Sequence, residues 1–330
     1  MGVRNGGRYL GEAVRSLLNQ TFGDWELLLI ENGSTDGAVD ELEASRPDAR
    51  IRIIRHAQSI GAGNALIAGC VVATGRYVAV LDHDDLALPR RLEVQRGFLE
   101  QHPEISLVGS VTEVIDSDGR SLGCEPCVAW HDDIYAMTAY VHVLRHSSVM
   151  FRREILKKTP YRGSLDTAED FDLFARTVEN FRVACVPVKL CQYRLHGDNL
   201  TVTNKPAAAM GGALVRMLTR RRRLGLAEDF SPWHARFLDL VAQPSRSEAE
   251  VHLGYARIFR EEGYFDLAAL HAWLALRTGG GLRAWWAYSW AVLRAGVRTK
   301  DASLDLAKAW IKEPAHQMLV RNGMPDRMQF

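Results

Sequence analysis

Two aspartates placed two positions apart could hold a metal ion. Asp82 and Asp84 follow the short apolar run 77–81, whose composition predicts a β-strand. In an extended chain, residues two apart point to the same side, so these carboxylates would lie together while His83 points away. Carboxylate oxygens suit a hard divalent cation that also binds phosphate oxygens. Aspartates are equally common in strand-to-loop turns, so spacing alone leaves metal binding and a plain polar turn open.

A second acidic pair, Glu169 and Asp170, stands before a predicted helix. Its apolar positions recur at helical spacing at Phe171, Phe174, Ala175 and Val178. On a structural interpretation, Thr167 caps this helix and the two acids favour the positive end of its dipole. From these residues alone, the structural interpretation is the better one.

The elements that must position these acids alternate between strand and helix. Strands are predicted at 25–30, 50–55 and 77–81, and helices at 9–18 and 65–73. This alternation indicates an α/β fold with a mostly parallel sheet flanked by helices. Ligands of such sheets bind beyond the carboxyl ends of the strands, where the polar segments 31–37 and 82–85 fall.

The sequence pattern changes after about residue 204, where strand-like runs stop. At 330 residues, two domains are expected: an α/β domain over 1–205 and a helical domain over 206–330. Small residues fit the spacing of a tetratricopeptide-like hairpin at Ala256, Gly263, Ala268, Ala272 and Ala275. One such hairpin cannot bury its own face, so it should pack on a neighbouring helix such as 282–293.

Composition narrows the partners and the compartment. With 41 basic and 40 acidic residues, the chain has no global field that would recruit nucleic acid. The five cysteines, with Cys124 and Cys127 as the only close pair, indicate reduced thiols in the cytoplasm. No signal peptide opens the sequence, and the aromatic stretch 284–293 is too short to span a bilayer. The arginines at 220–223 favour a solvated helix face, with peripheral contact at the inner face of the membrane as the alternative.

Several segments, in the right order, resemble family 2 of the glycosyltransferases, which have the GT-A fold. Residues 75–85 (GRYVAVLDHDD) and 89–93 (PRRLE) resemble the segment that carries the family's Asp-x-Asp signature. Residues 16–21 and 26–36 resemble its first helix, second strand and nucleotide-side turn. The resemblance covers roughly residues 3–200 and implies a nucleoside diphosphate sugar donor with Mn²⁺ or Mg²⁺.

The resemblance assigns donor-binding roles residue by residue. It implies that Glu31 faces the base, that Asp82 binds ribose or the water shell of the metal, and that Asp84 binds the metal. Arg4 belongs to the loop beside the nucleotide-sugar. Two positions depart from the family pattern, because Glu31 replaces an aspartate and Gly63 stands where arginine is frequent. The base is therefore open, and 61–64 is interpreted as a turn before a helix.

The resemblance also assigns the acceptor side and a further metal ligand. It identifies Asp170 as the catalytic base of an inverting enzyme, with Glu169 orienting it or contacting the acceptor. Such a carboxylate can take the proton of an attacking hydroxyl. Residues 193–196 resemble a segment in which Arg194 lies near the diphosphate and His196 completes the metal shell. Taken alone, a histidine after a strand is more often structural.

The first residues resemble the loop that follows the family's first strand, so the strand itself is expected to be missing. Two explanations are open: a start site further upstream, or an enzyme that has lost activity and persists as a binding protein. The first is favoured, because Asp82, Asp84, Asp170 and His196 are present together.

The expected function is inverting transfer of a sugar from a nucleoside diphosphate donor to a hydroxyl of a glycan or lipid-linked acceptor. One alternative is a non-catalytic nucleotide-sugar binding protein. A less favoured alternative is a nucleotidyltransferase, for which the beginning of the chain shows no glycine-rich, lysine-bearing loop to hold a triphosphate.

Overall fold

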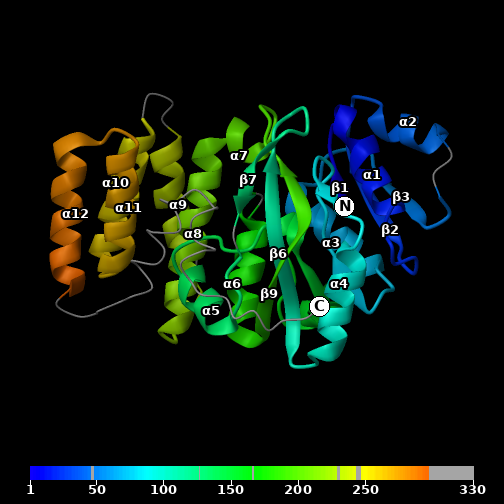
Figure 1. The fold of residues 1–330 in the computed structure, drawn as a ribbon. Coiled ribbons are helices and arrows are strands. Elements are labelled where there is room, and N and C mark those ends of the chain that lie inside the picture. The colour runs from blue at the N-terminus through cyan, green and yellow to red at the C-terminus, as the bar shows by residue number, and fades with distance from the viewer. Residues whose placement is uncertain (46–47, 126, 166, 229–230, 243–246, 297–330) are drawn as a thin grey trace. The chain divides into compact units, whose positions relative to one another are not determined.

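The computed structural model describes residues 1–296 except 46–47, 126, 166, 229–230 and 243–246 (Figure 1). The described chain forms two compact units. An α/β unit comprises 1–135 and 142–197, and a helical unit comprises 136–141 and 198–296. The helical unit thus begins before the boundary expected after residue 205, and it includes a short segment from the middle of the α/β sequence.

Sheet A of the α/β unit is parallel throughout. Its strands are β1 (Gly2–Val3), β2 (Leu27–Asn32) and β3 (Ile51–His56), in that order, and the adjoining helices are α1 (Leu10–Leu18), α2 (Ala38–Ala44) and α3 (Ala62–Val72). Apolar side chains from these elements form a common core that includes Val3, Leu10, Val14, Leu29 and Val39. The apolar run at 25–30 therefore became the buried parallel strand β2, as predicted.

β1 occupies part of the segment where the sequence predicted only a loop. It pairs in parallel with β2, with Gly2 opposite Ile30 and Val3 opposite Glu31. The Met1 amino group adds a hydrogen bond of 3.0 Å to a carbonyl of β2, that of Leu28. Two residues suffice here because each pairs its backbone polar groups with the edge of β2.

Sheet B is mixed, with the order β4-β8-β6-β9-β5 and β7 paired to β6. Its strands are β4 (Tyr77–Ala79), β5 (Leu86–Ala87), β6 (Ile105–Ile115), β7 (Ser121–Glu125), β8 (Met150–Arg152) and β9 (Arg182–Arg194). Only β6 and β9 run parallel to each other, and the other pairings are antiparallel. The α/β class is confirmed, with the parallel character concentrated in sheet A.

The connections of sheet B are helical. They are α4 (Arg91–Gln101), α5 (His131–Thr138) and α6 (Glu169–Asn180), together with the 3₁₀ helices η2 (His146–Ser148) and η3 (Arg153–Lys157). A further 3₁₀ turn, η1 (Gly7–Tyr9), precedes α1.

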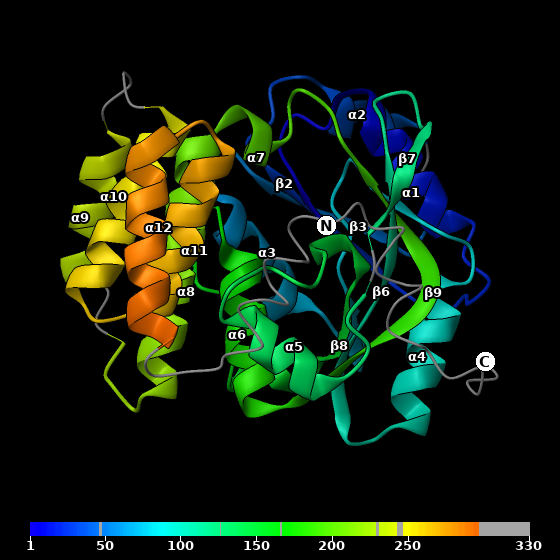
Figure 2. The same cartoon turned by 60° about the vertical axis from the view of Figure 1, so that its left-hand side comes forward.

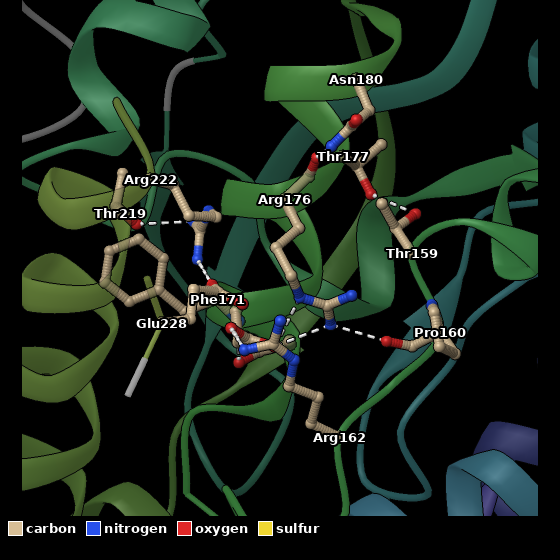
Figure 3. A network of polar contacts seen from close by, with 12 residues as sticks. Thr159, Pro160, Arg162, Phe171, Arg176, Thr177, Asn180, Thr219, Arg222 and Glu228 are labelled. Carbon is tan, nitrogen blue, oxygen red and sulfur yellow. Dashed lines mark hydrogen bonds and ion pairs between the residues drawn. The ribbon is translucent and has the colours of Figure 1, made fainter. Parts of the chain in front are cut away.

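Within α6 a buried ion pair forms, and its arginine also bonds to the loop before the helix (Figure 3). The side chain of Asp172 is fully buried, and Arg176 donates to it from Nε at 2.9 Å. The same guanidinium donates to the carbonyl of Pro160 at 2.6 Å, and the hydroxyls of Thr159 and Thr177 lie 3.3 Å apart nearby. These contacts tie 159–160 to the helix that begins with Glu169 and Asp170.

The helical unit contains α7 (Leu200–Thr203), α8 (Lys205–Arg223), α9 (Ser231–Val241), α10 (Glu248–Glu261), α11 (Phe265–Arg277) and α12 (Gly281–Gly296) (Figure 2). α10 packs on α11, and α12 packs on α11 in turn. The small side chains of the expected hairpin are buried at Ala256, Ala268, Ala272 and Ala275. Gly263 lies between the two helices with a positive φ of 80°. None of the described helices is long and apolar enough to cross a membrane.

Segment 136–141 joins the helical unit through its last residues. The hydroxyl of Tyr140 donates to Asp266 at 2.9 Å, and Nε of Arg216 donates to the Tyr140 carbonyl. Arg216 is deeply buried, and burial lowers its pKa to about 10. In the same unit, Arg222 of α8 donates to Thr219 at 3.0 Å and pairs with Glu228 (Figure 3).

Candidate active site

The acidic turn at 82–85 begins where β4 ends, and its backbone is held from two sides. The amide of Val80 donates to the carbonyl of Val149, and the amide of Asp82 donates to the hydroxyl of Ser147 at 3.0 Å. Beneath it lies the fully buried Arg91, which donates to the carbonyls of Val80 and Val149 at 2.6 and 3.0 Å. The position of the turn is therefore set by the buried interior of sheet B.

Asp84 and His196 meet although they are far apart in sequence. Oδ2 of Asp84 lies 3.0 Å from Nε2 of His196, which follows the end of β9. The ring of Tyr9 lies 4.7 Å from the imidazole, centroid to centroid. The structure thus brings together the two residues that the sequence analysis assigned to the metal shell at the strand ends.

Arg194 is hydrogen-bonded to the backbone of Asp84 next to this pair. Its side chain is 2% exposed, its Nε donates to the carbonyl of Asp84 at 3.0 Å, and its guanidinium pairs with Glu12 at 2.7 Å. The guanidinium also lies over the ring of Tyr9 at 4.6 Å. The charge of Arg194 therefore orients the acidic turn, a role that its position beside the expected diphosphate did not suggest.

Asp85 lies at the base of the same turn and is completely buried. Its Oδ1 accepts the backbone amide of Arg194 at 2.8 Å. Burial, reinforced by the charges of Asp84 and Asp82, raises the pKa of Asp85 well above its ordinary value. Burial and the neighbouring carboxylates thus favour the protonated form of Asp85.

Asp82 points to a histidine that sequence reasoning left without a role. Its Oδ1 lies 3.2 Å from Nδ1 of His146, and Nε2 of His146 lies 2.9 Å from the hydroxyl of Tyr161. Burial would raise the pKa of Asp82, but the charge of His146 outweighs it and holds that pKa below its usual range. Burial likewise opposes the charge of His146, yet Asp82 raises its pKa to about 9.

Glu31 is the last residue but one of β2, and Arg4 directly follows β1. Glu31 is buried, and its Oε1 accepts a hydrogen bond from the amide of Ser34 at 2.5 Å, so this carboxylate stabilises the turn that follows β2. The loop after β1 is joined to the same turn, because the amide of Asn5 donates to the hydroxyl of Ser34 at 3.0 Å. Arg4 is exposed on that loop. The two segments that the resemblance assigns to the nucleotide are therefore adjacent.

The Glu169–Asp170 pair opens α6. The helix begins after Ala168 without a side-chain cap, so the alternative in which Thr167 caps it is wrong. Oδ1 of Asp170 accepts the amide of Phe171 at 2.7 Å, which satisfies one backbone donor of the helix start. Burial first, and then the charge of Asp170, raises the pKa of Glu169 to about 8. Glu169 therefore keeps its proton at neutral pH, and Asp170 supplies the carboxylate of the pair.

The two acidic clusters converge on His146. Its charge interacts with Asp82 on one side and with Asp170 and Glu169 on the other. The strand end at 82–85 and the start of α6 are thus parts of one site. No sequence signal singled out His146, because its partners come from three distant segments.

Gly63, in the first turn of α3, lies close to Arg162 and to Glu169 at the start of α6. α3 begins at Ala62, so only Gly61 of the turn predicted at 61–64 precedes the helix, with a positive φ of 87°. A Cβ atom at Gly63 would lie 3.2 Å from the carbonyl oxygen of Arg162, so any larger residue here would be tightly packed against that segment.

The side chains of Asp84 and His196 suit a divalent cation that is also held by a ligand. Asp84 offers a carboxylate and His196 an imidazole, a combination that accepts manganese and leaves positions for phosphate oxygens and water. Within the described part of the chain, no three His, Cys, Asp or Glu side chains form a metal cluster by themselves. A cation held here would therefore depend on oxygens of the bound donor.

A sizeable cavity lies elsewhere in the α/β unit. It has a volume of about 590 Å³ and is lined by β2, α3 and β4 residues such as Leu28, Cys70 and Tyr77. Neither Asp84 nor Asp170 lines it. Cavity size alone would therefore point away from the acidic residues, and the chemistry of the side chains locates the site better.

Known proteins are similar to this chain in sequence and in fold. Residues 1–159 match the family model described as Glycosyl transferase family 2. The "Uncharacterized glycosyltransferase MJ1057" of Methanocaldococcus jannaschii is 30% identical over 57% of this chain. The match covers 66% of that relative, just under two thirds of its length. The "Putative glycosyltransferase EpsE" of Bacillus subtilis is 31% identical over 69% of this chain and 83% of EpsE. The chain belongs to glycosyltransferase family 2.

A solved structure of low identity shows the same fold. The S. aureus TarS 1-349 complex with UDP-GlcNAc superposes with a TM-score of 0.56, at 15% identity, over 89% of this chain and 90% of that chain. The GT-A fold implied by the sequence resemblance is thereby confirmed. In this family 2 chain, the fold places Asp84, His196 and Asp170 at one end of the sheets.

Proposed function

We propose that this protein transfers a sugar from a nucleoside diphosphate donor to a hydroxyl of a glycan or lipid-linked acceptor, with inversion at the anomeric carbon. The observation that carries the proposal is the contact of Asp84 with His196 at 3.0 Å. Two potential metal ligands from separate strand ends meet beside a turn that the family uses for the donor. Metal assistance, inversion and the acceptor are all part of the proposal.

Asp84 and His196 would hold the cation, and Asp82 would contact the donor from the same turn. A bound cation neutralises the negative charge that grows on the departing diphosphate, so no protein acid is needed there. Arg194 keeps the turn in place through the carbonyl of Asp84. Glu31 and Arg4 would border the nucleotide, where their two loops are joined.

Asp170 would act as the base on the acceptor side. Its Oδ1 is engaged by the amide of Phe171, so Oδ2 is the atom suited to take the proton of the acceptor hydroxyl. The hydroxyl oxygen attacks the anomeric carbon on the face opposite the departing diphosphate, through an oxocarbenium-like state. Glu169, which keeps its proton, would donate a hydrogen bond to the acceptor or to its neighbour.

Binding and product analysis test this proposal. UDP titrated calorimetrically in manganese should bind the wild-type protein and should bind far more weakly to the His196→Ala variant. His102→Ala is the matched control, because His102 also faces a carboxylate, that of Glu104 at 3.4 Å, on the surface after α4. Equal affinity of all three proteins would remove His196 from the donor site.

Incubation with UDP-N-acetylglucosamine or GDP-mannose should release the nucleoside diphosphate. Release of pyrophosphate from a nucleoside triphosphate and a sugar phosphate would indicate nucleotidyl transfer instead, and binding without turnover would indicate a binding protein. An α-linked donor should give a β-linked product by NMR. A product that retains the α configuration would contradict the role given to Asp170.

A further inference from the structure

His142 faces the carboxylate of the proposed base. Its Nε2 lies 3.4 Å from Oδ2 of Asp170. The ring is partly accessible, with 30% of the side chain exposed, whereas the Nε2 atom itself is buried and makes no hydrogen bond at this distance. One edge of the His142 ring is therefore open to solvent, and Nε2 on the other edge is directed at Asp170.

The orientation of this ring is fixed by two phenylalanines of α6. The imidazole stacks on Phe171 at 5.2 Å and on Phe174 at 5.5 Å, with interplanar angles of 30° and 29°. Both phenylalanines are buried, at 4% and 1% exposure. Because they are on the same helix as Asp170, the ring and the carboxylate share one rigid support.

The two oxygens of Asp170 have different partners. Oδ1 accepts the amide of Phe171 at 2.7 Å, and Oδ2 faces Nε2 of His142. A carboxylate bound at only one oxygen can still rotate about its last bond, whereas a contact at each oxygen defines its plane. Hydrogen bonds in ligand-free active sites are often long and shorten when substrate binds, so 3.4 Å is within the range for such a contact.

We propose that His142 is a positioning residue that donates its Nε2 proton to Oδ2 of Asp170 and so directs this carboxylate at the acceptor hydroxyl. The proposal rests on the assignment of Asp170 as the base in the proposed function. The acceptor proton goes to Asp170, while His142 remains neutral and gains or loses no proton in the step.

The groups around the ring are consistent with a neutral imidazole. Burial lowers the pKa of His142, and the charges of Arg145 and His146 act in the same direction, whereas Asp170 and Glu125 oppose them. Arg145 is itself paired with Glu125. A neutral ring has one N–H to donate, and the geometry places it on Nε2.

The first experiment needs no substrate. In the ¹⁵N-labelled wild-type protein at pH 7.5, NMR of the histidine rings should show His142 neutral with its proton on Nε2, assigned by its loss in His142→Phe. In Asp170→Asn, the titration midpoint of this ring should fall, because the carboxylate charge that favours the cation is gone. A proton on Nδ1 or an unchanged midpoint would overturn the proposal.

The second experiment measures turnover. His142→Phe keeps an aromatic ring against Phe171 and Phe174 but removes the donor, so the kcat of nucleoside diphosphate release should fall roughly ten- to a hundred-fold, with the donor KM unchanged. His142→Gln restores an N–H donor at a similar reach and should recover part of the loss. His102→Phe, which alters a histidine whose ring lies 4.5 Å from that of Phe98, is the matched control and should retain full kcat.

A double variant separates this proposal from the assignment of the base. If His142 acts through Asp170, Asp170→Asn combined with His142→Phe should be no slower than Asp170→Asn alone. A loss in Asp170→Asn with none in His142→Phe would refute the role of His142 and leave the base assigned. Full turnover in Asp170→Asn would refute the base itself, whatever the result for His142.

Discussion

The buried pair of Asp172 and Arg176 should be the most sensitive point of α6, and Arg176→Met tests this. The Asp172 side chain is fully buried and that of Arg176 is 6% exposed. Methionine keeps most of the apolar volume but leaves the carboxylate without its close partner. Arg162, whose side chain is 32% exposed, then remains near Asp172 at 3.6 Å.

The expected cost follows from what the variant leaves behind. Removing one partner of a buried ion pair costs about 3–5 kcal/mol, because the other charge stays buried. The carbonyl of Pro160 also loses the donor that lies 2.6 Å away. Since 1.4 kcal/mol is a factor of ten, amides of α6 should exchange roughly a hundred- to a few thousand-fold faster. Asp172→Asn with Arg176→Met, which removes both charges, should restore much of the loss.

Hydrogen exchange followed by mass spectrometry is the suitable assay, because it reports α6 separately from the helical unit. Arg96→Met on α4 is the matched control, since Arg96 pairs with Glu100 at the same helical spacing but on the surface. That variant should change local stability by less than about 1 kcal/mol. If Arg176→Met changes exchange in α6 no more than the control does, the reasoning about the buried charge is refuted.

Three further predictions concern the site and the helical unit. Asp84→Ala should abolish metal-dependent UDP binding in calorimetry with the fold intact by circular dichroism, and unchanged affinity would exclude Asp84 from the metal site. Asp170→Asn should lower kcat by roughly two to four orders of magnitude with donor affinity almost unchanged, and turnover within a few-fold of wild type would reduce Asp170 to a structural role. In the helical unit, His252 and His271 lie 3.2 Å apart, and burial, with the charge of Arg216, lowers the pKa of His252 to about 4 and that of His271 well below its usual value. Their folded-state values lie below the unfolded one, so stability is present above about pH 6.5 and should decline by roughly 3 kcal/mol for His252 as pH falls to about 4. Exchange in 248–277 that is independent of pH between 7 and 4.5, after correction for intrinsic rates, would contradict this.

The sequence was most informative where burial dictates composition. A strand covered on both faces must be apolar at nearly every position, so the run predicted at 25–30 was found as the buried strand β2. The run predicted at 50–55, in which arginines stand among isoleucines, was found as β3, a less buried strand at the edge of sheet A. The polar residues that follow such runs could be assigned to one end of the sheet by topology alone. Asp84 could be placed in this way without knowledge of any contact.

Contacts that depend on long-range register could not be predicted in the same way. The pairing of Asp82 with His146 requires β4 to lie beside β8, an antiparallel arrangement that no local pattern encodes. The passage of 136–141 into the helical unit depends on Tyr140 and Asp266, which lie 126 positions apart. Thr167 illustrates the opposite failure, because its capping motif is plausible locally but the helix begins one residue later.

The segment 142–148 connects the two halves of the site, and this explains why neither acidic motif is sufficient by itself. His142 faces Asp170 at the start of α6, and four residues later His146 contacts Asp82 of the acidic turn. Ser147 adds a hydrogen bond to the backbone of the acidic turn. Two aspartates that come from opposite ends of the α/β sequence are thus held by one short stretch of backbone, directly before β8. The relative position of donor and base is then a property of this stretch, which neither of the acidic motifs encodes.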